Sequence, residues 1–476
     1  MSDSVTFFEA QKTIHPRSVS GRYRRIKWLI TSGLLALYVI LPWLRWERGA
    51  GVPDQAVLID MGARRAYFFF IEIWPQEVYY LTGVLILAAV SLFFVTSLLG
   101  RVWCGYTCFQ TIWTDLFVAV ELLFQGDRNA RIKLDAQPLS FNKIWRKGAT
   151  HAVWLLIALL TGGVFVFYFN DAPTLAHQIL TLSVSPDIYL WSLGLTFSTY
   201  IMAGFAREQI CAYMCPYARF QSGMFDRDTL IISYDAERGE PRAPHKAGES
   251  WEGRGHCIDC GLCAAVCPVG IDIRNGLQME CIACGLCVDA CNGVMDKIGL
   301  PQGLVRYDTE NNTIGRSAAH REGRPWRDRL RLVRLRTVYY AVILLAVLGV
   351  MGGGLASRSV YEIHALHERN PLFTPLSSGG VRNSYTIKIL NKTHQAQSFV
   401  LSIPDAPPGV TLKIDGAGNP DVGHLNVPAD DVGSFRLMVS VPVDASLPYH
   451  FDFVATSLLD GKRIKTPSMF ITGEKE

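Results

Sequence analysis

Apolar residues in this chain gather in long blocks separated by polar segments. Five blocks are long enough to cross the hydrocarbon core of a bilayer, which takes roughly 20 helical residues. Several of these blocks have Trp or Tyr at their ends, as membrane helices commonly do. We therefore expect five transmembrane helices, at about Trp28–Trp46, Val78–Leu99, Ala152–Phe169, Ile188–Phe205 and Val338–Leu355.

Basic residues are distributed unevenly among the segments that connect these helices. Eight arginines lie between Arg316 and Arg336, just before the fifth helix, whereas residues 170–187 contain no Lys or Arg. Residues 47–77 contain three basic and five acidic side chains. The positive-inside rule therefore predicts a cytoplasmic N-terminus and an exported C-terminus. We expect the arginine run to anchor the fifth helix against anionic lipid, and we expect no nucleic-acid partner.

The last hundred residues have a period-two pattern that is typical of β-strands. Tyr385, Ile387 and Ile389 alternate with polar neighbours, and Asp460-Gly461 lies where a hairpin turn is needed. Similar alternation recurs near Phe399–Ile403, Val410–Ile414, Phe435–Val441, Tyr449–Ser457 and Met469–Thr472. About six or seven short strands of this kind predict an all-β sandwich of immunoglobulin type.

Eight of the twelve cysteines form two runs with the same spacing, C-x-x-C-x-x-C-x-x-x-C. Soft thiolates at this spacing are the ligands of two [4Fe–4S] clusters, and the fourth cysteine of each run then ligates the other cluster. The predicted ligand sets are Cys257, Cys260, Cys263 and Cys291 for one cluster, and Cys281, Cys284, Cys287 and Cys267 for the other. Zinc sites more often pair two C-x-x-C units. Asn292 stands where a proline usually follows the fourth cysteine. This departure weakens the prediction of which cysteines share a cluster more than the prediction that two clusters bind.

The other four cysteines form two C-x-x-x-C pairs, Cys104/Cys108 and Cys211/Cys215, each just after a predicted helix. Both pairs read C-x-Y-x-C, which hints at an internal duplication of a helical hairpin. Residues four apart lie on one face of a helix, so the four thiolates could meet at one leaflet of the membrane. They could bind Cu(I), a further iron–sulfur centre or zinc, act as a redox dithiol, or simply pack as small residues.

These patterns predict a multi-domain membrane protein in which all cysteines lie on or near the cytoplasmic side, as thiolates in a reducing compartment would. The predicted parts are a cytoplasmic N-terminal segment at residues 1–27, a four-helix membrane region at 28–206 with a cytoplasmic loop at 100–150, a cytoplasmic ferredoxin-type domain at 207–337, the fifth helix at 338–355 and an exported immunoglobulin-like domain at 380–476.

The order of these parts resembles one family, the cytochrome c oxidase accessory proteins called CcoG, FixG or RdxA, which are membrane polyferredoxins. The similarity rests on W-C-G-Y-x-C at residues 103–108, C-x-x-x-C-P at residues 211–216, the double ferredoxin run and the exported β-rich tail. It covers nearly the whole chain. One departure is Phe109, which follows Cys108 where a proline is expected, so the first pair is the weaker ligand candidate.

The resemblance implies a multi-pass protein of the bacterial inner membrane, with a periplasmic C-terminal domain, that reduces Cu(II) to Cu(I) for assembly of a haem–copper cytochrome c oxidase. Such a cupric reductase would take electrons from an unidentified cytoplasmic donor and serve the oxidase-assembly machinery or a copper carrier. Copper would be reduced transiently at Cys104, Cys108, Cys211 and Cys215.

Two alternatives stay open. A quinol-linked electron-transfer subunit of a periplasmic reductase has four spans and similar C-x-x-x-C-P pairs, but the exported β-domain is not expected of it. A non-enzymatic assembly scaffold could use the clusters as structure or as a redox sensor. The sequence contains no C-x-x-C-H motif and no G-x-G-x-x-G motif that opens a strand–helix unit, so haem c and a Rossmann cofactor are unsupported.

Overall fold

The computed structural model describes residues 14–49, 51–246, 248–404, 406–414 and 424–472. Residues 1–13 of the predicted N-terminal segment lie outside the described residues. The chain forms two compact units. The first contains Asp54–Met351 and the described residues up to Trp46, and the second contains the residues from Gly352 onward together with Glu47–Pro53.

Within the described residues, six helical stretches are long and apolar enough to cross a membrane. They are Arg22–Trp43, Pro75–Leu99, Val102–Gln125, Phe141–Tyr168, Pro186–Phe220 and Leu335–Ala356. Large apolar side chains such as Leu85, Leu190 and Leu345 are exposed on them, which indicates a lipid rather than an aqueous environment. The chain is therefore a membrane-type protein. Five stretches overlap the predicted blocks, and how many helices cross the bilayer stays a prediction.

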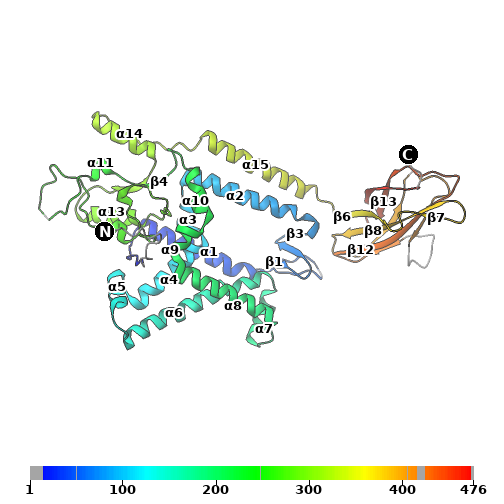
Figure 1. Cartoon of the computed structure of the whole chain (residues 1–476), viewed down its shortest axis with the longest axis horizontal. Coiled ribbons are helices and arrows are strands. Elements are labelled where there is room, and N and C mark those ends of the chain that lie inside the picture. Colours follow the sequence, from blue (N-terminus) through cyan, green and yellow to red (C-terminus); the bar gives the residue numbers. More distant parts are fainter. Residues whose placement is uncertain (1–13, 50, 247, 405, 415–423, 473–476) are drawn as a thin grey trace, which may run out of the picture. The chain divides into compact units, whose positions relative to one another are not determined.

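The helices of the first unit are drawn in Figure 1. Those that form or border the apolar stretches are α1 (Arg22–Ile40), α2 (Tyr79–Leu99), α3 (Val102–Tyr106), α4 (Phe109–Gln125), α5 (Arg128–Ala136), α6 (Phe141–Thr161), α7 (Ala172–Leu180), α8 (Pro186–Ile201), α9 (Arg207–Gln209), the π-helical turn η5 (Ile210–Met214), α10 (Pro216–Phe220) and α15 (Leu335–Ala356). A small antiparallel sheet of β1 (Val57–Asp60), β2 (Arg65–Phe68) and β3 (Ile71–Ile73) connects α1 to α2 and was not predicted.

The additional apolar stretch is mainly α4, which lies within the region predicted as a loop at residues 100–150. Asp115 and Glu121 interrupt its apolar pattern, yet both residues are buried. Asp115 pairs with the ammonium group of Lys27 at 2.9 Å, and Glu121 pairs with the guanidinium of Arg131 at 2.7 Å. Buried charges of this kind are tolerated because each has an opposite charge beside it.

The cysteine-rich region is compact and has little regular structure. Its elements are β4 (Ile231–Tyr234), α11 (Ala236–Gly239), α12 (Leu262–Ala265), α13 (Leu286–Lys297), β5 (Val305–Asp308) and α14 (Glu310–Arg321). Strands β4 and β5 pair antiparallel, with Ile231 opposite Asp308 and Tyr234 opposite Val305. Its apolar core is small and contains Ile232, Met295, Leu304 and Val305 together with Cys263. The two segments that carry the cysteine runs pack on this core.

The second unit is a β-sandwich, as the alternating pattern predicts. One sheet has the order β10-β12-β8-β6, with β7 also on β8, and the other has the order β11-β9-β13-β14. The strands are β6 (Tyr361–His367), β7 (Thr374–Pro375), β8 (Val381–Asn391), β9 (Gln397–Ser402), β10 (Thr411–Ile414), β11 (His424–Val427), β12 (Asp431–Val441), β13 (His450–Ser457) and β14 (Arg463–Met469). Tyr385, Ile387 and Ile389 are fully buried in the core. The predicted turn at Asp460-Gly461 connects β13 to β14, and Gly461 adopts a φ of 66° there.

Candidate functional site

Two small cavities in the cysteine-rich region are lined by the cysteines of the two runs. The cysteines of the first, about 30 Å³ in volume, are Cys257, Cys260, Cys263 and Cys291. Those of the second, about 20 Å³, are Cys267, Cys281, Cys284 and Cys287, together with Cys263. The fourth cysteine of each run therefore lies beside the first three of the other run. This is the arrangement that the crosswise ligand sets require, and the ligand assignment itself stays a prediction.

Both runs wrap around their cavity with the same backbone conformation. Each begins C-I-x-C-G-L-C, and the x residues, Asp259 and Ala283, have φ angles of 55° and 54°. The glycines that follow, Gly261 and Gly285, have φ angles of 64° and 75° and form the N-caps of α12 and α13. Left-handed backbone is uncommon for residues other than glycine and concentrates at functional sites. The repeated turn therefore marks the two runs as one structural motif used twice.

The buried thiols of these runs fit a metal cofactor. Burial raises the pKa of Cys263 and Cys267 to about 11, and that of Cys281 and Cys291 to about 12. Thiols with such pKa values are neutral at physiological pH, and a thiolate needs positive charge beside it to exist in this environment. Iron supplies that charge, so cluster binding would release protons from the thiols.

The C-x-x-x-C pairs lie at helix breaks rather than on one helical face. Cys104 belongs to α3, but Cys108 has extended backbone (φ −62°, ψ 128°) and is the N-cap of α4. Cys211 lies in η5, and Cys215 is likewise extended (φ −75°, ψ 115°) as the N-cap of α10. This corrects the expectation that each pair shares a continuous face. Pro216 explains the break at the second pair, because the residue before a proline is disfavoured in helical conformation.

The structure nevertheless brings the two pairs together. Cys104 interacts electrostatically with Cys108, Cys211 and Cys215. Cys104 and Cys211 also pack in the same apolar cluster as Cys284, which lines the second cavity. The four thiols therefore form one group that lies against the second cysteine cavity.

The segment that carries Cys104 is docked directly on the loop of the second cavity. A Cβ atom on Gly105 would lie only 3.0 Å from the Cα atom of Cys284, so only glycine permits this approach. The hydroxyl of Tyr106 donates a hydrogen bond to the carbonyl oxygen of Cys284 at 3.0 Å, and the guanidinium of Arg101 donates one to that of Cys281 at 3.1 Å. Sequence reasoning assigned no role to these three residues, although two of them belong to the W-C-G-Y motif.

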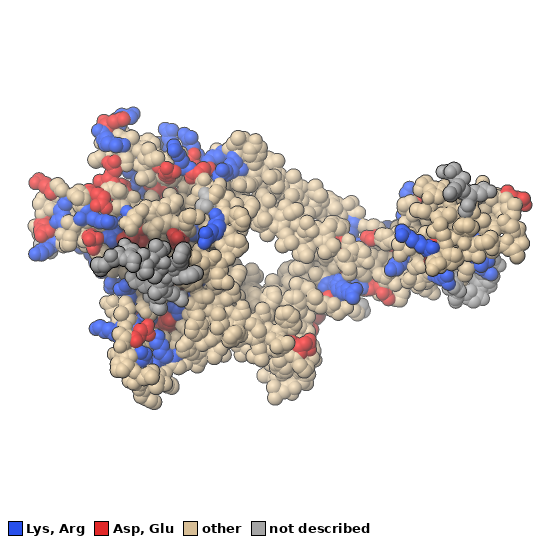
Figure 2. Space-filling view, viewed as in Figure 1, with Lys and Arg blue, Asp and Glu red and all other residues tan. Residues whose placement is uncertain are grey.

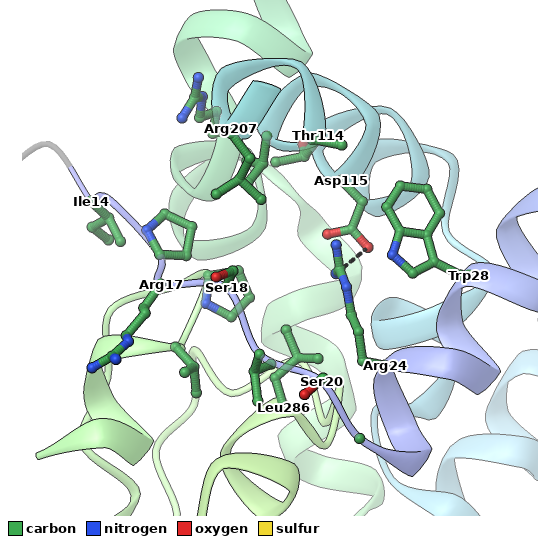
Figure 3. Close-up of a pocket in the computed structure, with 18 of the residues that line it drawn as sticks. Ile14, Arg17, Ser18, Ser20, Arg24, Trp28, Thr114, Asp115, Arg207 and Leu286 are labelled. Atoms are coloured by element: carbon green, nitrogen blue, oxygen red, sulfur yellow. Dashed lines mark hydrogen bonds and ion pairs between the residues drawn. The ribbon is translucent and has the colours of Figure 1, made fainter. Parts of the chain in front are cut away.

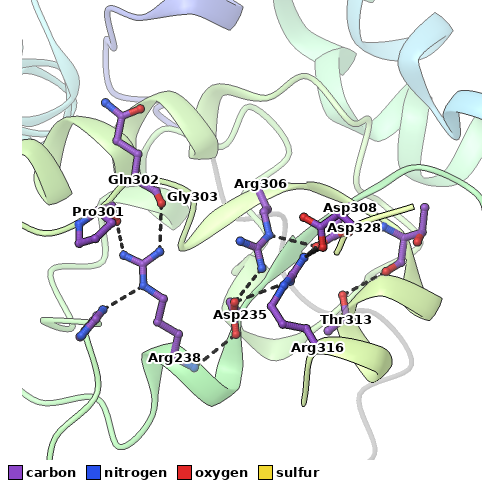
Figure 4. Close-up of polar contacts among 12 residues, drawn as sticks. Asp235, Arg238, Pro301, Gln302, Gly303, Arg306, Asp308, Thr313, Arg316 and Asp328 are labelled. Atoms are coloured by element: carbon purple, nitrogen blue, oxygen red, sulfur yellow. Dashed lines mark hydrogen bonds and ion pairs between the residues drawn. The ribbon is translucent and has the colours of Figure 1, made fainter. Parts of the chain in front are cut away.

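A network of ion pairs holds the elements around the first cavity together (Figure 4). Arg306, on β5, pairs with Asp235 at 2.7 Å and with Asp308 at 3.0 Å. Arg316, on α14, also pairs with Asp308, at 2.9 Å. The network thus connects the end of β4 with β5 and α14.

Arg238, on α11, contacts the residue before the first cysteine run and the loop before β5 (Figure 4). It donates hydrogen bonds to Nδ1 of His256 at 2.9 Å and to the carbonyl oxygen of Gln302 at 3.0 Å. It also interacts electrostatically with Cys291. Burial, followed by the charge of Arg238, lowers the pKa of His256, which suits its role as a hydrogen-bond acceptor. His256 therefore supports the loop beside Cys257 rather than being an independent site.

Charged side chains are concentrated on one part of the first unit. Figure 2 shows Lys, Arg, Asp and Glu gathered over the cysteine-rich region, around α5, α11, α13 and α14, whereas the long helices are covered mainly by uncharged residues. Within the first unit, this separation is typical of membrane helices joined to an extramembrane domain.

Comparisons with known proteins match both units. Residues 206–310 match the family model described as a 4Fe-4S dicluster domain, and residues 351–473 match the one described as an Ig-like fold at the C-terminus of FixG. All eight cysteines of the two runs lie inside the first match. The chain therefore contains a 4Fe–4S dicluster domain, and its β-sandwich is immunoglobulin-like.

Two curated relatives are similar over most of the chain. The nitrogen fixation protein FixG of Rhizobium meliloti (strain 1021) is 44% identical over 459 residues, which cover 91% of this chain and 87% of the relative. Protein RdxA of Cereibacter sphaeroides is 44% identical over 439 residues, which cover 92% and 91%. A crystal structure of a FixG-related protein from Vibrio parahaemolyticus aligns with 25% of this chain and all of its own, at 21% identity and a TM-score of 0.21.

Proposed function

Because the chain belongs to the FixG/RdxA family of membrane-type 4Fe–4S electron-transfer proteins, we propose that it reduces Cu(II) to Cu(I) for assembly of a haem–copper cytochrome c oxidase. The eight cysteines of the two runs hold the clusters in the crosswise sets given above. Copper is the substrate, and it binds transiently at the four cysteines of the C-x-x-x-C pairs.

The observation that carries this proposal is the docking of the Cys104 segment on the loop of the second cavity. Gly105 allows close backbone approach to Cys284, and Tyr106 and Arg101 fix the loop by hydrogen bonds to its carbonyl oxygens. A group of thiols beside a redox cofactor suits a substrate that accepts one electron. This contact supports an electron path from the dicluster domain to Cys104 and Cys211.

The chemistry of thiolates supports copper as the acceptor. When bound, the clusters would supply single electrons. One electron converts Cu(II) to Cu(I), and thiolate ligands stabilise the softer Cu(I). The positions of Cys104 and Cys211 in an apolar cluster would keep bulk water away from the bound ion.

The sidedness of the molecule belongs to the same proposal. The charge pattern supports a cytoplasmic dicluster domain and a periplasmic immunoglobulin-like domain. On the periplasmic side, the immunoglobulin-like domain would contact the oxidase-assembly machinery or a copper carrier. The match to the C-terminal domain of FixG favours this function over a quinol-linked subunit of a periplasmic reductase, in which such a domain is not expected.

The test is Cu(II) reduction by purified protein whose clusters have been reduced with dithionite and freed of excess reductant. We expect the double variant C211S/C215S to reduce Cu(II) at least about tenfold more slowly, while its iron and sulfide contents are unchanged. The matched control is M214L, because Met214 lies between the two cysteines and is exposed. An unchanged rate in the double variant would exclude these cysteines as the copper site.

A further inference from the structure

A large cavity in the first unit lies between the N-terminal segment, α1, α4 and the cysteine-rich region (Figure 3). Its volume is about 740 Å³, which is within the usual range for an organic ligand or cofactor. Neither the cysteine cavities nor the C-x-x-x-C pairs account for it. The cavity therefore calls for an occupant of its own.

The wall of this cavity adjoins the second cysteine site. Pro268, which lines the cavity, directly follows Cys267, and Leu286 directly precedes Cys287. Leu286 also packs in the apolar cluster that contains Cys284. A molecule in the cavity would contact residues that directly neighbour cysteines of the second set in the chain, so it would lie beside that site.

The opposite wall comes from two of the apolar helices. Trp28 of α1 and Val118 and Leu122 of α4 provide an apolar surface. Asp115 and Glu208 provide carboxylates in the same cavity. An apolar surface with a few polar groups suits a molecule that has a polar redox head and an apolar body, and such molecules enter from the membrane phase.

Four arginines line the cavity: Arg17, Arg24, Arg25 and Arg207. Arg24 pairs with Asp115 at 3.4 Å and lies over the ring of Trp28 at 4.9 Å (Figure 3). Arg207 pairs with Glu121 at 2.5 Å. Asp115 and Glu121 also balance Lys27 and Arg131, so the wall keeps positive charge, which disfavours a cation such as Cu(II). The apolar surface favours a ligand with an apolar body, and an anionic lipid headgroup is the competing occupant that the experiment distinguishes.

We propose that this cavity binds a membrane quinol and is the site where electrons enter the protein. The inference rests on the proposed function for the direction of electron flow. Oxidation of one quinol to quinone releases two electrons and two protons. When bound by the two cysteine sets, the clusters would accept these two electrons, one each. The protons pass to the carboxylates of Asp115 and Glu208, and from there to water.

The test fills the cavity without touching any cysteine. The variant A119F places a phenyl ring in the cavity, because Ala119 on α4 lines it. The matched control L123F introduces the same side chain on the same helix at a position that is 76% exposed and does not line the cavity. The probe is decylubiquinol, added anaerobically to the intact holoprotein while the visible absorbance of the clusters is recorded.

We expect A119F to be reduced by decylubiquinol at least about tenfold more slowly than the native protein, and L123F to behave like the native protein. Reduction by dithionite and the iron content should be unchanged in both variants. As a readout of binding alone, a photoreactive azido-quinone should label α1 or α4 in the native protein and in L123F, but not in A119F.

Two results would overturn the proposal. The first is reduction of A119F by decylubiquinol at the native rate. The second is an anionic phospholipid that is retained by the native protein and lost in A119F, with quinol oxidation intact, which would identify a lipid headgroup site. Failure of the copper proposal can be distinguished from failure of this one. Dithionite-reduced protein needs no electrons from the cavity, so A119F should reduce Cu(II) at the native rate.

Discussion

Gly105 lies where α3 approaches the loop of the second cysteine cavity. A Cβ atom at this position would lie 2.8 Å from the carbonyl oxygen of Ile282 and 3.0 Å from that of Ala283. Both are backbone atoms, which cannot rotate away as the end of a side chain can. We expect G105A to lower the free energy of unfolding by about 1–3 kcal/mol and to change the EPR signal of the second cluster. Thermal unfolding and EPR of the reduced protein measure the two effects.

The control for this prediction is G148A. A Cβ atom on Gly148, within α6, would meet no atom within 4 Å. Alanine is the better helix former, so this variant should be as stable as the native protein or more stable by up to about 1 kcal/mol. If G105A were as stable as G148A and its EPR signal were native, the close docking of α3 on the loop would be wrong.

Ion pairs connect the β4–β5 pair with α14. Asp308 has only 4% of its side chain exposed and accepts hydrogen bonds from both Arg306 and Arg316. In D308N, each of the two guanidinium groups loses one of the carboxylates that balance it. We expect a loss of about 1–3 kcal/mol in stability, smaller than for a fully buried pair because both arginines are partly exposed. Denaturant unfolding and the EPR signal of the first cluster measure this effect.

Arg316 also provides the control for this prediction. It pairs with Asp328 at 2.5 Å, but the side chain of Asp328 is 58% exposed. Exposed ion pairs contribute less than about 1 kcal/mol because water and salt screen them. D328N should therefore be nearly neutral. Similar losses in D308N and D328N would mean that burial of Asp308 does not determine the strength of the network.

The elements that the sequence predicts are those whose pattern is local. Apolar blocks, alternating strands and the hairpin at Asp460-Gly461 depend on neighbouring residues, and the structure contains them. Helix α4 could not be predicted in this way, because Asp115 and Glu121 are balanced by Lys27 and Arg207, which are distant in the sequence. The docking of Gly105 on Cys284 is also non-local, and no spacing rule reveals it. The grouping of the cysteines can thus be predicted from their spacing, but the contacts that surround each group cannot.

The two units obtain their stability from different sources. The sandwich has a large apolar core, in which Tyr385, Phe399 and Phe453 are fully buried. The cysteine-rich region has a small core, so metal binding must contribute much of its folding free energy. We expect removal of iron with a chelator to unfold residues 206–310 while the sandwich keeps its native melting temperature. Calorimetry should then show loss of one transition only, and limited proteolysis should locate the cleavages within residues 206–310.

The pH dependence of any residual structure in iron-free protein provides a further test of this picture. Burial raises the pKa of Cys267 to about 11 and that of Cys281 to about 12, from an ordinary value of 9.0. Between pH 9 and pH 11 the folded state therefore binds more protons than the unfolded state, and its stability must fall as the pH rises. In the holoprotein the thiols have already lost their protons to cluster binding, so the same range should have little effect on its melting temperature. Where the iron-free region keeps its fold, an equal pH dependence of the iron-free protein and the holoprotein would show that these thiols are not the cluster ligands.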